Sequence, residues 1–185
     1  MSKKELRSII MDKRQYVEIG NKKIWDENIK KNLLNSEEYK KADTVFIYVS
    51  MSDEVNTIDI IETMLKEGKR VAVPKVITGL KAMEALEIKG FSDLSESGAF
   101  GILEPTMDAK NISNEIDLSI VPGLAFDCKK RRLGYGGGFY DKFFAKYDKS
   151  IKIALCYEYQ ILDEIEVENF DKEMDILITE KRIIK

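Results

Sequence analysis

The residues best placed for chemistry in this chain form a glycine-rich segment between two apolar runs. Four of its eleven glycines fall within five residues: Gly134, Gly136, Gly137 and Gly138. An apolar run at 118–121 precedes them and an amphipathic run at 139–147 follows. A strand, a glycine loop and a helix start, in this order, present backbone amides and a positive helix end to an anion. The segment therefore predicts a phosphate-binding loop.

Two common phosphate-binding fingerprints do not describe this loop. The G-x-G-x-x-G pattern fails because its last position is Phe139, and no Gly-Lys-Ser/Thr follows as a P-loop requires. Four basic residues precede the glycines: Lys129, Lys130, Arg131 and Arg132. They offer cations to a polyphosphate, yet a solvated loop or a weak nucleic-acid patch has the same composition. Asp141, one turn into the predicted helix, either holds Mg²⁺ or stabilises the helix start.

The composition limits the chemistry further. The 185 residues include no histidine, which excludes Ser-His-Asp and Cys-His nucleophiles and His-ligated zinc. A net charge of −3 argues against a protein that coats nucleic acid. Cys128 and Cys156 form no C-x-x-C pair and are expected to stay reduced. No apolar run approaches the ~20 residues of a membrane span. We expect a cytoplasmic protein with no membrane or nucleic-acid partner.

Hydrophobic periodicity predicts the elements that position the loop. Helices are expected over 3–17, from an N-cap at Asn21 to Leu33, in a short turn from Ser36, over 57–68 and over 139–147. Strands are expected at 44–50, 70–76, 86–88, 118–121, 151–157 and 175–179. No linker or repeat divides the chain. This order predicts one α/β domain over 1–185, a layered fold with a mostly parallel central sheet flanked by helices.

The segment from Pro122 to Asp141 resembles the signature of the 5-formyltetrahydrofolate cyclo-ligase family, also called 5,10-methenyltetrahydrofolate synthetases. It reads Pro-Gly-x-Ala-Phe-Asp, then four residues, then Arg-Leu-Gly-x-Gly-x-Gly-Phe-Tyr-Asp. Segments 3–7, 48–57 and 171–179 are similar to the same family in order and spacing. The resemblance spans most of the chain.

The resemblance implies an ATP-dependent ligase that closes 5-formyltetrahydrofolate to 5,10-methenyltetrahydrofolate and releases ADP and phosphate. In the implied chemistry, the γ-phosphoryl group passes to the formyl oxygen, N10 attacks the activated carbon and phosphate departs. ATP is then a co-substrate and Mg²⁺ a cofactor, with small molecules as partners and a monomer or weak dimer expected. The alternative is a non-catalytic relative of the same fold that binds folate or a nucleotide.

The resemblance also implies residue roles. ATP is expected to bind to Lys3, Lys4, Arg7, Arg132, Leu133, Gly134, Tyr135, Gly136, Gly137, Gly138, Phe139 and Tyr140. The folate is expected to bind to Val49, Glu54, Tyr135, Gly136, Gly137, Gly138 and Phe139. Catalysis is assigned to Arg132 and Tyr140, and the metal to Asp141 and Asp175. Whether Asp171 joins Asp175 stays open.

Several of these residues also fit ordinary structural roles. Glu54 fits an exposed acidic turn, Val49 a core strand, and the pair Lys4 and Arg7 a solvated helix face. The chain also departs from the family at three places: Lys130 and Arg131 where glycine is frequent, Phe139 where tyrosine is common, and Phe170 in place of a histidine. These departures motivate the non-catalytic alternative.

Overall fold

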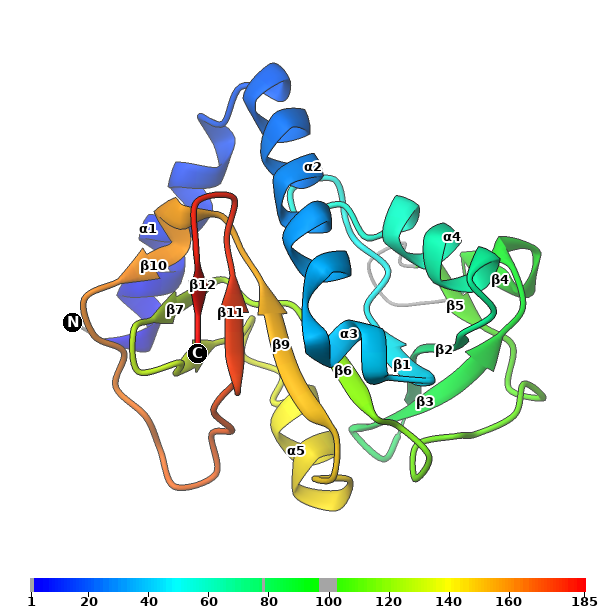
Figure 1. The fold of residues 1–185 in the computed structure, drawn as a ribbon. Coiled ribbons are helices and arrows are strands. Elements are labelled where there is room, and N and C mark those ends of the chain that lie inside the picture. Colours follow the sequence, from blue (N-terminus) through cyan, green and yellow to red (C-terminus); the bar gives the residue numbers. More distant parts are fainter. Residues whose placement is uncertain (1, 78, 97–102) are drawn as a thin grey trace.

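A seven-stranded sheet forms the centre of the computed structural model, which describes residues 2–77, 79–96 and 103–185. The strand order is β12-β11-β9-β6-β1-β2-β3 (Figure 1). The strands are β1 Thr44–Ile47, β2 Arg70–Ile77, β3 Ala82–Ile88, β6 Leu118–Val121, β9 Ile151–Leu155, β11 Ile176–Ile178 and β12 Ile183–Ile184. The five middle strands run parallel, and the edge strands β3 and β12 run antiparallel. The predicted α/β fold with a mostly parallel sheet is confirmed.

Helices cover both faces of this sheet, which makes three layers (Figure 1). The helices are α1 Lys3–Gln15, α2 Ile19–Asn35, α3 Glu37–Lys41, α4 Ile58–Lys66 and α5 Phe139–Lys146. Because side chains alternate along a strand, Val45 and Ile47 of β1 pack under α2, α3 and α4. Phe46 points to the other face, where its ring centroid lies 4.7 Å from that of Phe143 in α5.

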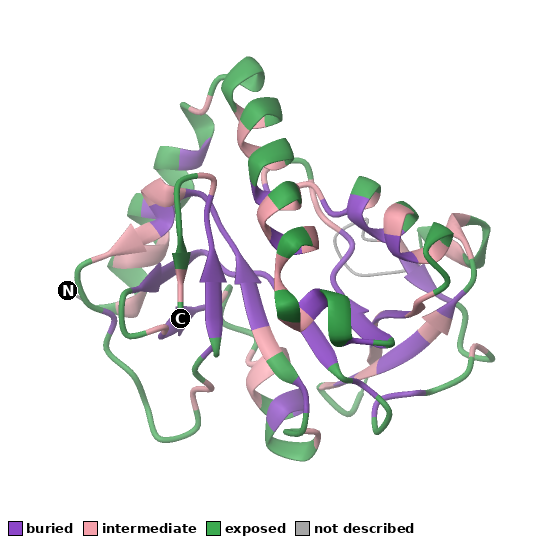
Figure 2. Cartoon of the chain, in the orientation of Figure 1, coloured by how far each residue is buried: buried purple, intermediate pink, exposed green. Residues whose placement is uncertain are grey.

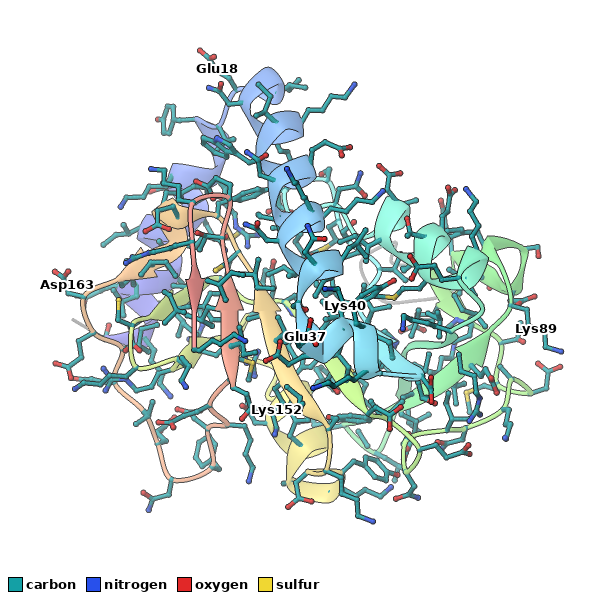
Figure 3. The ribbon with its side chains drawn as sticks, in the orientation of Figure 1. Glu18, Glu37, Lys40, Lys89, Lys152 and Asp163 are labelled. Carbon is teal, nitrogen blue, oxygen red and sulfur yellow. The ribbon has the colours of Figure 1, made fainter. Side chains whose placement is uncertain are left out.

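Burial follows this layering. The central strands are buried along most of their length, whereas the outer faces of the helices are exposed (Figure 2). Charged side chains such as those of Glu18, Lys89 and Asp163 project from the periphery (Figure 3). No helix in the described part of the chain is long and apolar enough to cross a membrane.

A second, three-stranded sheet supports the glycine loop. It has the order β10-β7-β8, with β7 Ala125–Asp127, β8 Arg132–Leu133 and β10 Ile161–Leu162. Helix α1 packs on it through Ile10, which is fully buried with Leu124, Leu133 and Ile165. A two-stranded sheet joins β4 Leu94–Glu96 to β5 Leu103–Pro105. Strands of two or three residues are too short for periodicity, so the sequence did not indicate these sheets.

Some element boundaries differ from the predictions. The N-cap at Asn21 is wrong, because α2 begins at Ile19 and Asn21 lies in its first turn. The strand predicted at 44–50 ends at Ile47, where the chain turns and Thr57 donates through its backbone N–H to the Ser50 hydroxyl at 3.1 Å. The strands predicted at 151–157 and 175–179 are also shorter, while the one at 86–88 begins earlier, at Ala82.

Lys130 occupies a backbone conformation that favours glycine. It lies in the turn between β7 and β8 with φ of 64°, and its N–H donates to the Asp127 carbonyl at 2.8 Å. A left-handed conformation crowds the Cβ of any residue other than glycine. The frequent glycine of the resembling family therefore matches a requirement of this turn, which Lys130 meets under strain.

Replacing Lys130 with glycine should relieve this strain. We expect Lys130→Gly to raise the free energy of unfolding by about 1 kcal/mol, measured by urea denaturation, because the left-handed penalty disappears. Lys129→Gly is the matched control, since Lys129 has no positive φ. That control should leave stability unchanged or lower it. Equal effects of the two substitutions would contradict the assignment of strain to Lys130.

Candidate active site at the glycine loop

The predicted phosphate-binding loop connects β8 to α5 and turns sharply at two glycines. Gly136 has φ of 103°, and Gly138, the N-cap of α5, has φ of 66°. Both values are unfavourable for any residue with a Cβ. The loop therefore delivers the chain to the first turn of α5 with its backbone exposed, as anion binding at a helix start requires.

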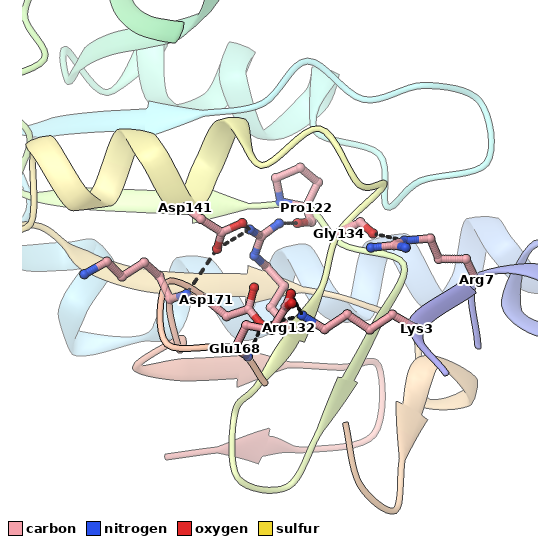
Figure 4. A network of polar contacts seen from close by, with 9 residues as sticks. Lys3, Arg7, Pro122, Arg132, Gly134, Asp141, Glu168 and Asp171 are labelled. Atoms are coloured by element: carbon pink, nitrogen blue, oxygen red, sulfur yellow. Dashed lines mark hydrogen bonds and ion pairs between the residues drawn. The ribbon is translucent and has the colours of Figure 1, made fainter. Parts of the chain in front are cut away.

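Arg132 and Asp141 close the two ends of the loop. The Nη2 of Arg132 donates to both carboxylate oxygens of Asp141 at 3.0 Å (Figure 4). The guanidinium carbon also lies 5.4 Å from the ring centroid of Tyr140. The Nε of Arg132 is buried and has no hydrogen-bond partner within the described ranges. Of the four basic residues at 129–132, Arg132 is the one that this pair places beside the loop.

Two other charges of this basic run, those of Lys129 and Arg131, are engaged elsewhere. Arg131 donates to the buried Asp127 through Nε at 2.6 Å and also pairs with Glu164 at 3.2 Å. Lys129 pairs with Glu164 at 3.2 Å. These contacts stabilise the turn between β7 and β8 and join it to the segment after β10, so Lys129 and Arg131 do not form an open cationic patch.

Helix α1 brings cations to the same loop. The Nε of Arg7 donates to the Gly134 carbonyl at 2.9 Å, and Lys3 pairs with Asp171 at 2.6 Å and with Glu168 at 2.8 Å (Figure 4). Lys3 and Arg7 lie four residues apart and therefore share a helix face. Lys4 is exposed on a different face. The structure thus brings Arg7 to the loop and Lys3 to the adjacent segment at Asp171, rather than the pair Lys4 and Arg7 to the loop.

The segment that carries Asp171 packs against Asp141. Asp171 accepts from Lys3, and the backbone N–H of the next residue, Lys172, donates to Asp141 at 3.1 Å. Asp175 lies just before β11, where its carboxylate accepts from the Lys152 backbone at 2.7 Å. Asp171 therefore lies on the segment next to Asp141, while Asp175 has separate partners at the start of the strands. In the sequence, Asp171 was indicated by its position at the start of the motif at 171–179, four residues before Asp175.

The acidic residues at the loop suit one kind of metal site. Within the described ranges no group of three or more Asp, Glu, Cys or His residues lies close enough to bind an ion. Magnesium usually takes one or two carboxylates and completes its shell with waters and substrate phosphates. The oxygen donors of Asp141 and Asp171, beside the glycine loop, fit that coordination chemistry.

Glu54 contacts the loop from the turn after β1, through Tyr135. It lies in the turn after β1, only 6% exposed, and accepts from the Tyr135 hydroxyl at 2.7 Å and from the Met51 N–H at 2.9 Å. Burial raises the pKa of Glu54, while these hydrogen bonds and the charge of Arg14 oppose that rise. Glu54 is therefore a buried carboxylate held by donors, not the exposed acid of an ordinary turn.

The remaining predicted site residues divide between the loop and the core. Gly136 and Gly137 are exposed at the loop. The side chain of Leu133 is buried in the apolar cluster of the small sheet. The ring of Phe139 is partly buried against the α5 cluster and also lies directly over Gly137 of the loop. Val49 is buried in the main core just past β1.

Sequence reasoning missed Arg14 and Asp53. Arg14 donates to Asp53 and to the Tyr135 hydroxyl, both at 2.8 Å. The available signal was its spacing, because Arg14 follows Arg7 by seven residues and thus lies on the same face of α1.

The fold and the site together define an α/β protein with a glycine loop between a cationic helix and a buried carboxylate. A model of the 5-formyltetrahydrofolate cyclo-ligase family matches residues 1–180, and the chain belongs to this family. The resemblance noted from the sequence is confirmed.

Similar proteins agree with the family match. A probable 5-formyltetrahydrofolate cyclo-ligase of Schizosaccharomyces pombe is 33% identical over 174 residues, covering 85% of each chain. The Haemophilus influenzae 5-formyltetrahydrofolate cyclo-ligase is 30% identical and covers 83% of this chain and 84% of its own. The NMR structure of Aquifex aeolicus 5,10-methenyltetrahydrofolate synthetase has a TM-score of 0.87 and 32% identity, covering 99% of this chain and 92% of that one.

Glu54 should titrate differently from an exposed glutamate. We expect a carboxyl ¹³C NMR titration to give Glu54 a pKa above its ordinary value of 4.5, because burial disfavours the charged form. Glu164 is the internal control, since hydrogen bonds from Lys129 and Arg131 lower its pKa below 4.5. Glu54→Gln identifies the resonance. A Glu54 value at or below that of Glu164 would contradict the buried environment.

Proposed function

We propose that this protein closes 5-formyltetrahydrofolate to 5,10-methenyltetrahydrofolate with ATP, releasing ADP and phosphate. The observation that carries the proposal is the glycine loop, which lies between the cations of α1 and the buried pair of Glu54 and Tyr135. Such a loop has one face for a polyphosphate and another for a polar heterocycle. Membership of the family supports this reaction class.

For ATP, the proposed binding groups are the loop amides and three cations. Arg7 from α1 contacts the loop at Gly134, Arg132 from β8 pairs with Asp141 at its far end, and Lys3 of α1 holds the neighbouring segment at Asp171. Phosphoryl transfer depends mainly on positioning and on neutralising charge, and it needs no histidine. Arg132 is the proposed catalytic cation, with the Tyr140 ring fixed beside its guanidinium.

For the metal, we propose Asp141 and Asp171 as the protein ligands of Mg²⁺. The ion, when bound, would neutralise phosphate charge as the γ-phosphoryl group leaves ATP. Asp141 already faces the loop, and Asp171 lies beside it on the segment that Lys3 holds. Asp175 is the less suitable partner because it is half exposed and paired with Lys152.

For the folate, we propose that the Glu54 carboxylate accepts hydrogen bonds from pterin N–H groups. The chemistry then follows the family: the formyl oxygen takes the γ-phosphoryl group, and N10 attacks the formyl carbon. The carbon–oxygen bond breaks, phosphate leaves with that oxygen and the N10 proton is lost. The enclosed position of Glu54 limits competition from water for those hydrogen bonds.

The departures from the family pattern leave the proposed cations and carboxylates unchanged, which favours an enzyme over a non-catalytic relative. Lys130 lies in the hairpin turn, Phe139 packs on the α5 side of the core, and Phe170 is 65% exposed. Each departure alters a turn, the packing or the surface. The loop itself keeps its glycines, Arg132 and Asp141.

The remaining proposals concern partners and location. We propose a cytoplasmic monomer or weak dimer that acts on folate and ATP, with no nucleic-acid or membrane partner. The net charge of −3 and the engagement of Lys129 and Arg131 by acidic residues support the nucleic-acid part of this proposal.

An absorbance assay tests the reaction directly. With 5-formyltetrahydrofolate, ATP and Mg²⁺, the near-ultraviolet absorbance of the methenyl product should rise, and it should not rise without ATP. Asp141→Ala should lower kcat/KM by about 100-fold, since it removes a metal ligand and the partner of Arg132. No absorbance rise with folded wild-type protein would refute the activity. Tight folate binding without ATP consumption would instead favour the non-catalytic alternative.

A matched pair of substitutions tests the metal assignment. Asp171→Asn should raise the Mg²⁺ concentration needed for half-maximal activity by about 10-fold, because magnesium loses one of its two carboxylates. Asp175→Asn, four residues further on, should leave that concentration within about 2-fold of wild type. The reverse pattern would restore Asp175 as the ligand and remove Asp171.

A further inference from the structure

Arg14 lies on the same face of α1 as the two cations that reach the glycine loop. Lys3, Arg7, Ile10 and Arg14 are separated by four, three and four residues, which keeps all four on one side of the helix. The rise of 1.5 Å per residue places Arg14 about 16 Å along the axis from Lys3. One helix thus reaches from the acidic pair Asp141 and Asp171 to the surroundings of Glu54.

The guanidinium of Arg14 joins three separate parts of the site. It donates to Asp53 at 2.8 Å in the turn after β1, to the Tyr135 hydroxyl at 2.8 Å in the loop, and to the Gly123 carbonyl at 3.1 Å after β6. Its carbon also lies 5.6 Å from the Tyr135 ring centroid. Arg14 itself is only 8% exposed, so its guanidinium is largely shielded from water.

These contacts fix the direction of the Tyr135 hydroxyl. Arginine has donors but no acceptor, so the Tyr135 oxygen must accept from Arg14 and turn its own hydrogen elsewhere. That hydrogen goes to Glu54 at 2.7 Å. The second carboxylate oxygen of Glu54 accepts from the Met51 N–H. Arg14 therefore determines the orientation of Tyr135, and Tyr135 that of Glu54.

Arg14 also compensates the charge around Glu54. The groups that act on Glu54 or respond to its charge are Arg14, Asp53, Tyr48, Tyr135 and Tyr140. Burial raises the pKa of Glu54 and Asp53 adds to that rise, while Arg14 is the cation that opposes it. Without Arg14 the turn would hold two carboxylates with no cation between them.

We propose that Arg14 is a positioning residue for the folate side of the site, acting through Tyr135 and Glu54 without touching the substrate. Arg7, on the same helix, holds the adjacent loop residue Gly134 and serves the nucleotide side. The inference rests on the proposed function for the identity of the ligand. Arg7 and Arg14 lie seven residues apart on one helix, but Arg7 supports binding of the nucleotide and Arg14 supports binding of the folate.

Steady-state kinetics of single and double variants test this separation. Arg14→Gln and Tyr135→Phe should each raise KM for 5-formyltetrahydrofolate about 10-fold, because Glu54 loses its fixed donor. Their effect on KM for ATP should stay within about 2-fold, and Arg7→Gln should show the opposite split. The double variant should resemble either single variant, since both substitutions remove one relay. Lys13→Gln, an exposed neighbour, is the control and should match wild type.

Two further readouts distinguish positioning from stability. Folate affinity should be measured by calorimetry over a series of decreasing pH values. In Arg14→Gln it should begin to fall at a higher pH than in wild type, because loss of the cation raises the pKa of Glu54 and the carboxylate is protonated earlier. The thermal midpoint of each variant shows whether it is folded at the assay temperature. Equal rises in both KM values, multiplying effects in the double variant, or a loss of activity explained by unfolding alone would each overturn the proposal.

Calorimetry also keeps this inference distinct from the proposed reaction. If wild type binds 5-formyltetrahydrofolate but forms no methenyl product, the proposed activity fails, and the roughly 10-fold weaker binding of Arg14→Gln still supports the inference. If wild type and Arg14→Gln bind the folate equally well, the inference fails although the activity stands. If wild type binds no folate, both fail.

Discussion

The geometry of the site depends on the ion pair between Arg132 and Asp141. This pair joins β8 to the first turn of α5 and so fixes both ends of the glycine loop with a single guanidinium. Their side chains are 5% and 17% exposed, so the attraction is screened less than in a surface pair. Loss of either partner leaves a shielded charge without compensation. The Arg132–Asp141 pair thus fixes the curvature of the loop without a bound ligand.

The site neutralises its own charge through several such pairs. Lys3 is paired with Asp171, Arg14 with Asp53, and Arg132 with Asp141. Under the proposed function, a polyphosphate competes with Asp171 for Lys3 and with Asp141 for Arg132, and each of these two cations exchanges one set of oxygens for another. The displaced carboxylates are the same groups proposed to hold Mg²⁺. Binding of nucleotide and of metal is then coupled: the nucleotide frees the carboxylates by pairing with their cations, and the metal gives those carboxylates a new positive partner.

The sequence predicted those parts of the structure that local pattern determines. Apolar runs predicted the parallel strands, and the glycines with Arg132 and Asp141 predicted the loop, whose residues are close in sequence. The contacts of Arg14 were beyond such reasoning, since its partners Asp53 and Tyr135 lie 39 and 121 residues away. The contact between Lys3 and Asp171 likewise joins residues that are far apart in the sequence, at a separation of 168. Pairings of this kind follow from how the small sheet and α1 pack, and no periodicity encodes them.

The way α1 is attached affects the fraction of molecules that can bind ligand. This helix rests on the small sheet through its own apolar cluster around Ile10, apart from the two clusters that hold the large sheet. Such a unit can detach at a smaller free-energy cost than global unfolding. Since α1 carries Lys3, Arg7 and Arg14, every molecule with α1 detached lacks three of the site's cations at once. The apparent affinity for ligand is then the intrinsic affinity multiplied by the fraction of molecules with α1 docked.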